Sequence, residues 1–308
     1  MKRRVVKHGP STYIISLPTN WVKKYGINKG DELEVNENSK TLLISTDSIK
    51  TDLEVSKDIS NLSSNLMHPL LVIFYLKGYD KIFLKHNDLK LLEKIQKQIP
   101  QLIGYEIVEQ DDKTCLIQSI SQKIDLEFDN SLRKAFLTLK SMLEMIYEAY
   151  SKGDHNTLKN IHLKDLEVNR LCFLCLRKIN REALDLKNNE DKNILYFLIT
   201  MLERYGDGLK DLASNLTKTK RKNKDILNLL KLLLDHYEAC YSYFYDATKD
   251  KANKEFNIYR EIKELFDNIF TKDLRKEEIL AVYFIRDCIY KMANFTRMRI
   301  DLLKEDKK

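Results

Sequence analysis

Hydrophobic and polar positions divide the chain into three blocks with different periods. In residues 1–48, short apolar runs alternate with polar positions and are separated by turn residues, a pattern typical of β-strands. Between the second and third runs, the segment 18–25 predicts a short helix that stops at Gly26. We expect strands at 5–6, 13–17, 32–35 and 41–44. The first block is therefore predicted to be a small, β-rich domain.

Residues 49–125 predict a second, small α/β unit that connects the first block to the rest of the chain. Helical spacing of apolar residues alternates here with short runs rich in Ile, Val and Phe. The expected elements are helices at 60–76 and 88–99, a strand at 81–84, and a hairpin of strands 105–108 and 114–117 that turns at Asp111 and Asp112.

From residue 126 to residue 308 the apolar positions follow only a helical period. No proline occurs after Pro100, and the breaks between segments are short and polar, which favours antiparallel neighbours in a bundle. Six helices are expected, at 129–151, 156–186, 190–217, 223–249, 254–271 and 275–304. Two sets of three helices are the simplest packing. The fold class predicted for the whole chain is multidomain α+β.

Composition supports a folded, helix-rich protein, since 43% of the 308 residues are hydrophobic and 32% are charged. The longest apolar run, 70–76, is too short to span a bilayer, and the basic N-terminus does not lead into an apolar signal segment. The five cysteines form no disulfide framework for a chain of this size. Cys172 and Cys175 share one face of an expected helix and are interpreted as core residues. The predicted location is cytoplasmic.

Positive charge is concentrated at the N-terminus. Residues 1–30 contain seven Lys or Arg and no acid, which equals the formal net charge of +7 for the whole chain. Such a local field attracts polyanions and accelerates encounters with them. A solvated basic terminus is the alternative interpretation.

The same N-terminal block resembles the AbrB (SpoVT/AbrB-like) DNA-binding domain. The resemblance rests on the Leu17-Pro18 step, the helix closing on residues 25–27, and the turn at 29–31 before a strand. It implies a dimeric β-barrel with swapped hairpins, and it implies DNA contacts from Arg3, Arg4, Lys7, Lys23 and Lys24. The segment 9–13 departs from the family pattern, where many members have a shorter turn.

A second motif lies in the third expected helix. Glu203, Asp207 and Asp211 follow one another at four-residue steps, so their carboxylates share one helix face, and Asp165 on the preceding helix could complete a set of oxygen ligands. The alternative is an acidic surface paired with Arg204 and Lys210. Gly206, a costly residue in mid-helix, suggests that another helix approaches closely beside these acids.

This run, from Glu203 to Asp207, together with the segment 164–169, resembles the paired motifs of PhoU-like proteins. The resemblance implies two tandem three-helix bundles, binding of iron, zinc or another divalent metal, and regulation of phosphate uptake. The sixth expected helix has Ile285 and Ile289 at the acidic positions, and the fifth keeps only Glu255. We therefore expect at most one metal site, in the first bundle.

None of the common catalytic motifs occurs in the sequence, so the chain is not expected to be an enzyme. The combined resemblance is to archaeal phosphate uptake regulators. It implies a cytoplasmic, DNA-binding transcription regulator of phosphate homeostasis, acting as a negative regulator and as a homodimer or higher homo-oligomer. Its expected partners are double-stranded DNA and a phosphate ABC transporter or signalling component.

Two alternative functions stay open at this point. The chain could be an adaptor that does not bind DNA and docks on a phosphate transporter or a signalling kinase. An antitoxin-like regulator is a third hypothesis. It fits less well, because antitoxins join such an N-terminal domain to a short toxin-binding tail rather than to a large helical domain.

Overall fold

The computed structural model describes residues 2–38, 41–46, 53–120, 127–181, 189–269 and 271–303. The chain divides into two compact units, residues 1–52 and residues 53–308. The domain boundaries expected from the sequence, near residues 48 and 125, both lie outside the described residues. The division into three domains therefore stays a prediction.

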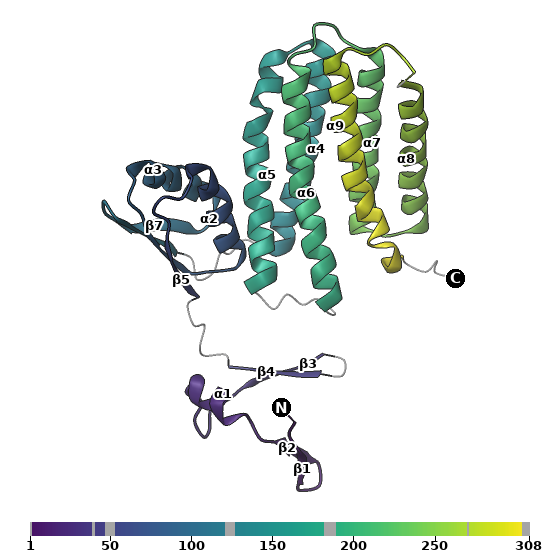
Figure 1. Ribbon diagram of the computed structural model, residues 1–308. Helices are drawn as coiled ribbons and strands as arrows, with labels where there is room; N and C mark the ends of the chain where they lie inside the picture. Colours follow the sequence, from purple (N-terminus) through teal and green to yellow (C-terminus); the bar gives the residue numbers. More distant parts are fainter. Residues whose placement is uncertain are drawn as a thin grey trace. The chain divides into compact units, whose positions relative to one another are not determined.

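The N-terminal unit consists of two β-hairpins joined by a short helix (Figure 1). Strand β1 (Val5–His8) pairs antiparallel with β2 (Thr12–Ile15), and β3 (Glu34–Asn38) pairs antiparallel with β4 (Thr41–Ser45). Helix α1 (Thr19–Lys24) lies between the hairpins in the sequence. These elements confirm the predicted ones, with bounds that differ by a few residues.

No described side chain of this unit is buried. Apolar side chains on its four strands are largely exposed instead. They are Val5, Val6, Tyr13, Ile14, Ile15, Val35 and Leu42. By itself, the described part of the unit has no hydrophobic core.

The second unit begins with a four-stranded sheet in the order β5-β6-β8-β7. Strand β5 runs parallel to β6, and the other neighbours are antiparallel. The strands are β5 (Glu54–Asp58), β6 (Lys81–Lys85), β7 (Tyr105–Gln110) and β8 (Thr114–Ser119). Strand β5 was not predicted, because Val55 is its only apolar residue and its pairing is with a strand distant in sequence.

Helices α2 (Met67–Leu76) and α3 (Leu89–Gln98) pack against this sheet. In β6, Ile82 and Leu84 are buried while Phe83 between them is 40% exposed, so the sheet packs through one face. The predicted helical start at residue 60 is wrong. Asn61 has a left-handed φ of 64°, which a right-handed helix cannot contain, and the α-helix begins only at Met67.

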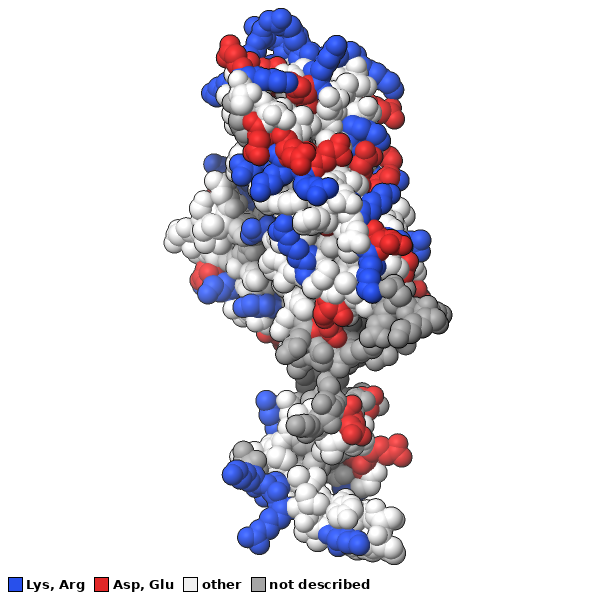
Figure 2. All heavy atoms as spheres, turned by 90° about the vertical axis from the view of Figure 1, so that its right-hand side faces the viewer, with Lys and Arg blue, Asp and Glu red and all other residues white. Residues whose placement is uncertain are grey.

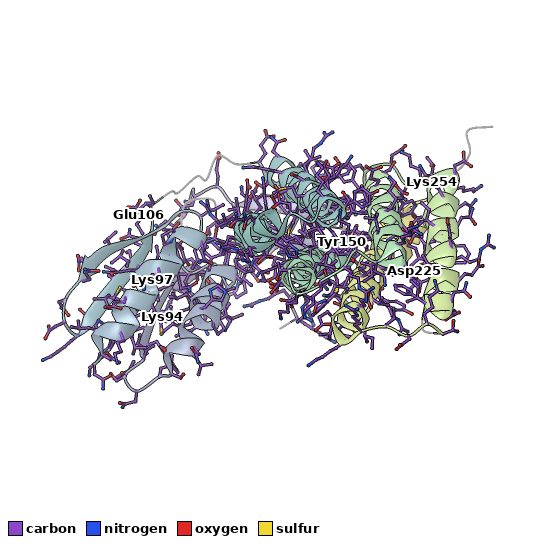
Figure 3. The ribbon with its side chains drawn as sticks, turned by 90° about the horizontal axis from the view of Figure 1, so that it is seen from above. Lys94, Lys97, Glu106, Tyr150, Asp225 and Lys254 are labelled. Atoms are coloured by element: carbon purple, nitrogen blue, oxygen red, sulfur yellow. The ribbon has the colours of Figure 1, made fainter. Side chains whose placement is uncertain are left out.

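Among the described residues that follow this sheet, six long antiparallel helices form the rest of the second unit, with the α/β part beside α5 (Figures 1 and 3). They are α4 (Phe128–Lys152), α5 (His155–Arg181), α6 (Asn189–Leu216), α7 (Lys224–Tyr245), α8 (Lys249–Ile269) and α9 (Lys276–Arg297). Six helices occur where six were predicted, but the predicted break at 250–253 is wrong, because α7 ends at Tyr245 and α8 already begins at Lys249. Helix α9 ends at Arg297, earlier than expected, and the expected ends at 186 and 304 lie outside the described residues.

Local capping groups explain where several of these helices begin and end. Gly153 ends α4 in the left-handed conformation, with φ of 75°. The Asp154 carboxylate then accepts hydrogen bonds from the first backbone amides of α5, and the side chain of Asn223 does the same for α7. These polar breaks are the ones that the sequence pattern indicated.

The two expected sets of three helices share one hydrophobic core. A single buried cluster contains side chains from all of α4 to α9. At its centre Tyr205 of α6 stacks on Tyr237 of α7 with ring centroids 5.4 Å apart, and the Tyr237 hydroxyl donates to the carbonyl of Phe136 in α4. The sets are therefore packed together as one body.

Cys172 and Cys175 lie buried in this core as free thiols, which confirms their interpretation as core residues. The same is true of Cys240 and Cys288. Among the described helices, none combines the length and the apolar composition that crossing a membrane requires.

Candidate functional site

The five basic residues expected to contact DNA are all exposed on the N-terminal unit. Lys7 lies on β1, and Lys23 and Lys24 form the last turn of α1. Among the described residues, none of the five forms an ion pair with a carboxylate. In the view of Figure 2, the Lys and Arg side chains of this unit lie mainly on one side and its Asp and Glu side chains on the other. The unit thus presents an unneutralised basic surface.

The four predicted metal ligands lie along the contact of α5 with α6. Asp165 is 2% exposed on α5, whereas Asp211 on α6 is exposed to solvent. The ammonium group of Lys210 lies between two of the acids. Its Nζ is 2.7 Å from Asp165 Oδ2, and it also pairs with Asp207. The second oxygen of Asp165, Oδ1, is buried and has no hydrogen-bond partner.

Burial and like charges shift the protonation of this cluster. Burial, together with the charges of Asp207 and Asp165, raises the pKa of Glu203 to about 7. Burial also raises the pKa of Asp165, against the opposing effect of Lys210. For Lys210 itself, burial lowers the pKa, but the hydrogen bonds and charges of Asp165 and Asp207 outweigh it and leave the pKa raised. The lysine therefore stays charged.

This arrangement does not bring the four acids together as a ligand set. Within the described part of the chain, one group of three residues has ligand atoms within 4.8 Å of one another, and it is His236, Cys240 and Glu255. At the acidic cluster, the Lys210 ammonium takes the place that a cation would need. A metal site at these acids stays a prediction, and Lys210 would have to leave for it to form.

The sequence analysis missed the group of His236, Cys240 and Glu255. One signal for it was present, since His236 and Cys240 are four residues apart on one helix and so share a face. The third residue comes from another helix, and only the tertiary structure shows that it faces the other two.

Two glycines allow α6 to approach helices on both of its sides. A Cβ atom at Gly206 would lie 3.2 Å from Asp165 Oδ1 and 3.3 Å from Leu139 Cδ2. At Gly208 it would lie 2.9 Å from Cys288 Sγ on α9. The close helix approach expected beside the acids is confirmed, and α6 is held tightly between the two halves of the helical core.

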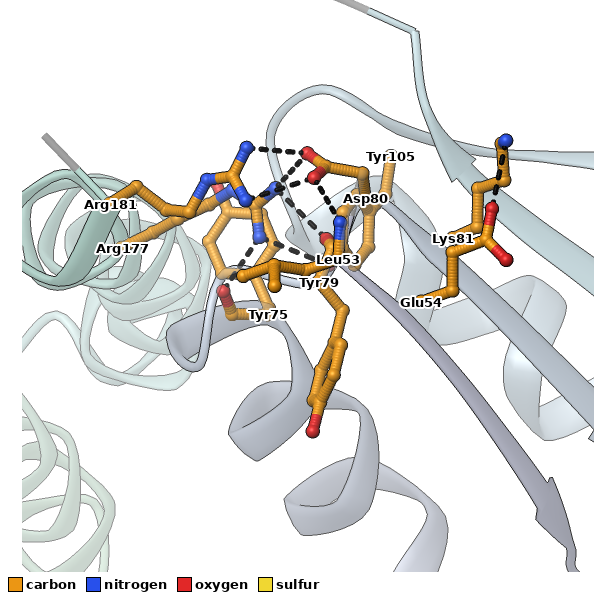
Figure 4. Close-up of polar contacts among 9 residues, drawn as sticks. All are labelled: Leu53, Glu54, Tyr75, Tyr79, Asp80, Lys81, Tyr105, Arg177 and Arg181. Carbon is orange, nitrogen blue, oxygen red and sulfur yellow. Dashed lines mark hydrogen bonds and ion pairs between the residues drawn. The ribbon is translucent and has the colours of Figure 1, made fainter. Parts of the chain in front are cut away.

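A buried arginine connects the helices to the α/β part (Figure 4). Arg177 of α5 donates to the carbonyl oxygens of Tyr75 at 2.8 Å and Tyr79 at 3.0 Å, and to the hydroxyl of Tyr105 at 3.1 Å. Its guanidinium group also lies about 5 Å from the ring centroids of Tyr75 and Tyr105. Burial raises the pKa of Tyr105 to about 12, so its hydroxyl stays protonated and donates to the Tyr79 carbonyl.

Arg181, one helical turn further on, strengthens this junction. It forms an ion pair of 2.9 Å with Asp80. The Asp80 carboxylate is also 3.6 Å from Arg177, and it accepts a hydrogen bond from the backbone amide of Leu53. The side chain of Arg181 crosses directly over Gly78, where a Cβ atom would come within 2.4 Å of it. The end of α5 and the loop after α2 are thus joined by charge-assisted hydrogen bonds that are buried or partly buried.

Comparison with protein families identifies two known domains in the chain. Residues 6–51 match the family model described as antidote-toxin recognition MazE, bacterial antitoxin, and residues 132–216 match the PhoU domain. The chain therefore fuses a MazE/AbrB-like N-terminal domain to a PhoU domain. This confirms the pair of resemblances inferred from the sequence.

A particular relative is the protein described as "Uncharacterized protein MJ1641" of Methanocaldococcus jannaschii. The two are 26% identical over an alignment of 156 residues, which covers 48% of this chain and 54% of the relative. The chain thus spans about half the length of this curated relative. No solved structure matches the chain.

Proposed function

We propose that this protein is a DNA-binding transcription regulator of phosphate uptake whose N-terminal unit binds DNA as a homodimer. The observation that carries the proposal is the N-terminal unit itself, in which no described side chain is buried and apolar strand residues are exposed. About 45 residues cannot form a sufficient core alone, and oligomerisation supplies one. A second copy, paired through swapped hairpins into a β-barrel, would cover these apolar side chains.

Dimerisation would also place two copies of the basic surface on one DNA-binding face. Phosphate contacts from Arg3, Arg4 and Lys7 on the first hairpin, and from Lys23 and Lys24 on α1, would dominate the affinity. Sequence preference would come largely from groove shape. Because counterions are released from DNA when such contacts form, the affinity is expected to fall steeply with salt.

A salt series of DNA-binding measurements tests this proposal. In a dimer, the double variant Lys23→Ala/Lys24→Ala removes four cations, so the slope of log affinity against log salt should decrease by up to about 3.6. The matched control is Lys94→Ala/Lys97→Ala on α3, two exposed lysines of the second unit (Figure 3). Equal slopes for the two double variants would contradict the proposed DNA contacts.

The oligomeric state of the full chain provides an independent test. Val6 is 59% exposed on β1, and Val6→Asp would place a charge in the proposed dimer core. Sedimentation should show a dimer for the parent chain and a monomer for this variant. Phe83→Asp is the control, since Phe83 is exposed to 40% on the sheet of the second unit. If Val6→Asp leaves the mass unchanged, the barrel is not the interface.

The helical domain is proposed to sense phosphate status and to act negatively on uptake. Its match to the PhoU domain supports this role. The sensed signal would be a metal or ligand, or a partner such as a phosphate transporter or signalling component. The buried contacts of Arg177 would transmit helix movements to the α/β part, and the α/β part would pass them on to the N-terminal unit. Both matched families are regulatory, and we propose no catalytic activity.

An antitoxin function is a second candidate, because residues 6–51 match an antitoxin family. It predicts that a toxin partner co-purifies with the chain and that the chain relieves its toxicity. The α/β part that follows the N-terminal unit has a hydrophobic core, to which α5 contributes Phe173, and it occupies the place of a short toxin-binding tail. We therefore favour the regulator.

A further inference from the structure

A compact group of metal-ligand side chains lies buried between α7 and α8. His236 and Cys240 are one helical turn apart on α7, and both are 0% exposed. Glu255 of α8 is 4% exposed, and its Oε1 lies 2.8 Å from His236 Nε2. The Cys240 sulfur lies 3.8 Å from the same nitrogen, and all three ligand atoms are within 4.8 Å of one another.

The convergence of thiol and carboxylate on one nitrogen distinguishes this group from a catalytic relay. In a Cys-His-acid relay the thiol and the acid use different ring nitrogens, so that one orients the ring while the other transfers the proton. Here both face Nε2, whereas Nδ1 is buried without a hydrogen-bond partner. The three donor atoms are therefore close enough together to ligate one cation.

The types of the donors select the class of cation. Imidazole, thiolate and carboxylate together suit Zn²⁺ and similar transition metals, which accept mixed N, S and O ligands in tetrahedral geometry. They do not suit Mg²⁺ or Ca²⁺, which take oxygen ligands.

We propose that His236, Cys240 and Glu255 bind one zinc-class divalent cation, which fastens α8 to α7. Helix α8 needs such an attachment, because only four of its 21 residues are buried, against ten of 22 in α7. Glu255 is one of those four and the only charged one. The site lies in the second set of three helices, not in the first, and it does not depend on the DNA-binding function.

Cobalt substitution in the full chain tests the site. The protein is produced in minimal medium containing Co²⁺, and its metal content and absorption spectrum are measured after purification. Co²⁺ stands in for Zn²⁺, and thiolate coordination gives a near-ultraviolet charge-transfer band together with the visible bands of a tetrahedral ion. We expect one cobalt per chain with both features.

Three variants distinguish metal binding at this site from metal binding elsewhere on the chain. Cys240→Ala should abolish the charge-transfer band, whereas Cys288→Ala, which removes another buried thiol of the second helical set, should retain it. Glu255→Gln should keep the band but weaken metal binding at least about tenfold. Hydrogen exchange in α8 of the parent chain should slow when metal is bound.

The proposal is overturned if the parent chain shows no thiolate–cobalt band, or if Cys288→Ala loses the band as Cys240→Ala does. If metal binds only at surface sites, the purified protein will contain cobalt but show no charge-transfer band. That result would also overturn the proposal. The test for a thiolate–cobalt band in the parent chain needs no variant, so it remains decisive even if a variant fails to fold.

Discussion

Replacement of Arg177 by Ala should release the α/β part from the helices. The side chain of Arg177 is 7% exposed, and it donates to the buried Tyr75 carbonyl, the buried Tyr105 hydroxyl and the half-buried Tyr79 carbonyl. Its removal withdraws the charged donor from these three groups, although the Tyr75 carbonyl keeps the Gly78 amide and the Tyr79 carbonyl keeps the Tyr105 hydroxyl. It also withdraws one of the two cations from Asp80. Hydrogen bonds to a charged group are each worth about 1.5–3 kcal/mol, so losing those of Arg177 should cost about 4 kcal/mol.

Native-state hydrogen exchange of the β6 and β8 amides, compared with those of α4, measures this effect locally. Because each 1.4 kcal/mol is a factor of ten, the exchange of β6 and β8 should accelerate about a thousandfold in Arg177→Ala. The amides of α4 should change less.

Two further variants provide the controls. Arg181→Ala removes an arginine that is 25% exposed, and since Arg177 remains, it should cost about 1 kcal/mol. Arg177→Lys should recover only part of the loss, because an ammonium group cannot match the planar fork of the guanidinium. If Arg177→Ala costs no more than Arg181→Ala, the proposed attachment through Arg177 is wrong.

Two other predictions concern α6. The pKa of Glu203 is raised from 4.5 to about 7 in the folded chain, so stability is full below pH 4.5, falls as the pH rises through 7, and is then constant. Urea unfolding of Glu203→Gln should therefore show a gain over the parent chain of at most about 3 kcal/mol at pH 8.5, and none near pH 4.5; a gain independent of pH would contradict the assigned cause. Gly208→Ala should destabilise by about 1–3 kcal/mol despite the better helix propensity of Ala, because the new Cβ meets Cys288 Sγ at 2.9 Å. The double variant with Cys288→Ala should regain most of that loss in thermal unfolding, and a stabilising Gly208→Ala would refute the close approach.

The sequence was sufficient wherever structure is determined locally. The ends of the long helices follow from residues such as Gly153, Asp154 and Asn223, whose backbone conformation or side-chain hydrogen bonds act within a few positions. Gly206 likewise predicts a close helix contact, because a glycine in mid-helix needs a compensating reason.

Features that depend on distant residues could not be predicted in this way. Strand β5 has one apolar residue, and its place is fixed by parallel pairing with β6. The position of Lys210 between Asp165 and Asp207 depends on how α5 and α6 pack. The contact of His236 with Glu255 likewise joins two helices. In each case the partner comes from another element, and a single sequence does not specify which elements meet.

Genome-wide occupancy of the protein in cells grown with high and low phosphate tests the central claim most directly. The account predicts discrete sites at promoters of phosphate-uptake genes, occupied differently in the two conditions and lost in Lys23→Ala/Lys24→Ala but not in Lys94→Ala/Lys97→Ala. Occupancy that is absent, or that is the same in both conditions and in both variants, would contradict a DNA-binding regulator of phosphate uptake.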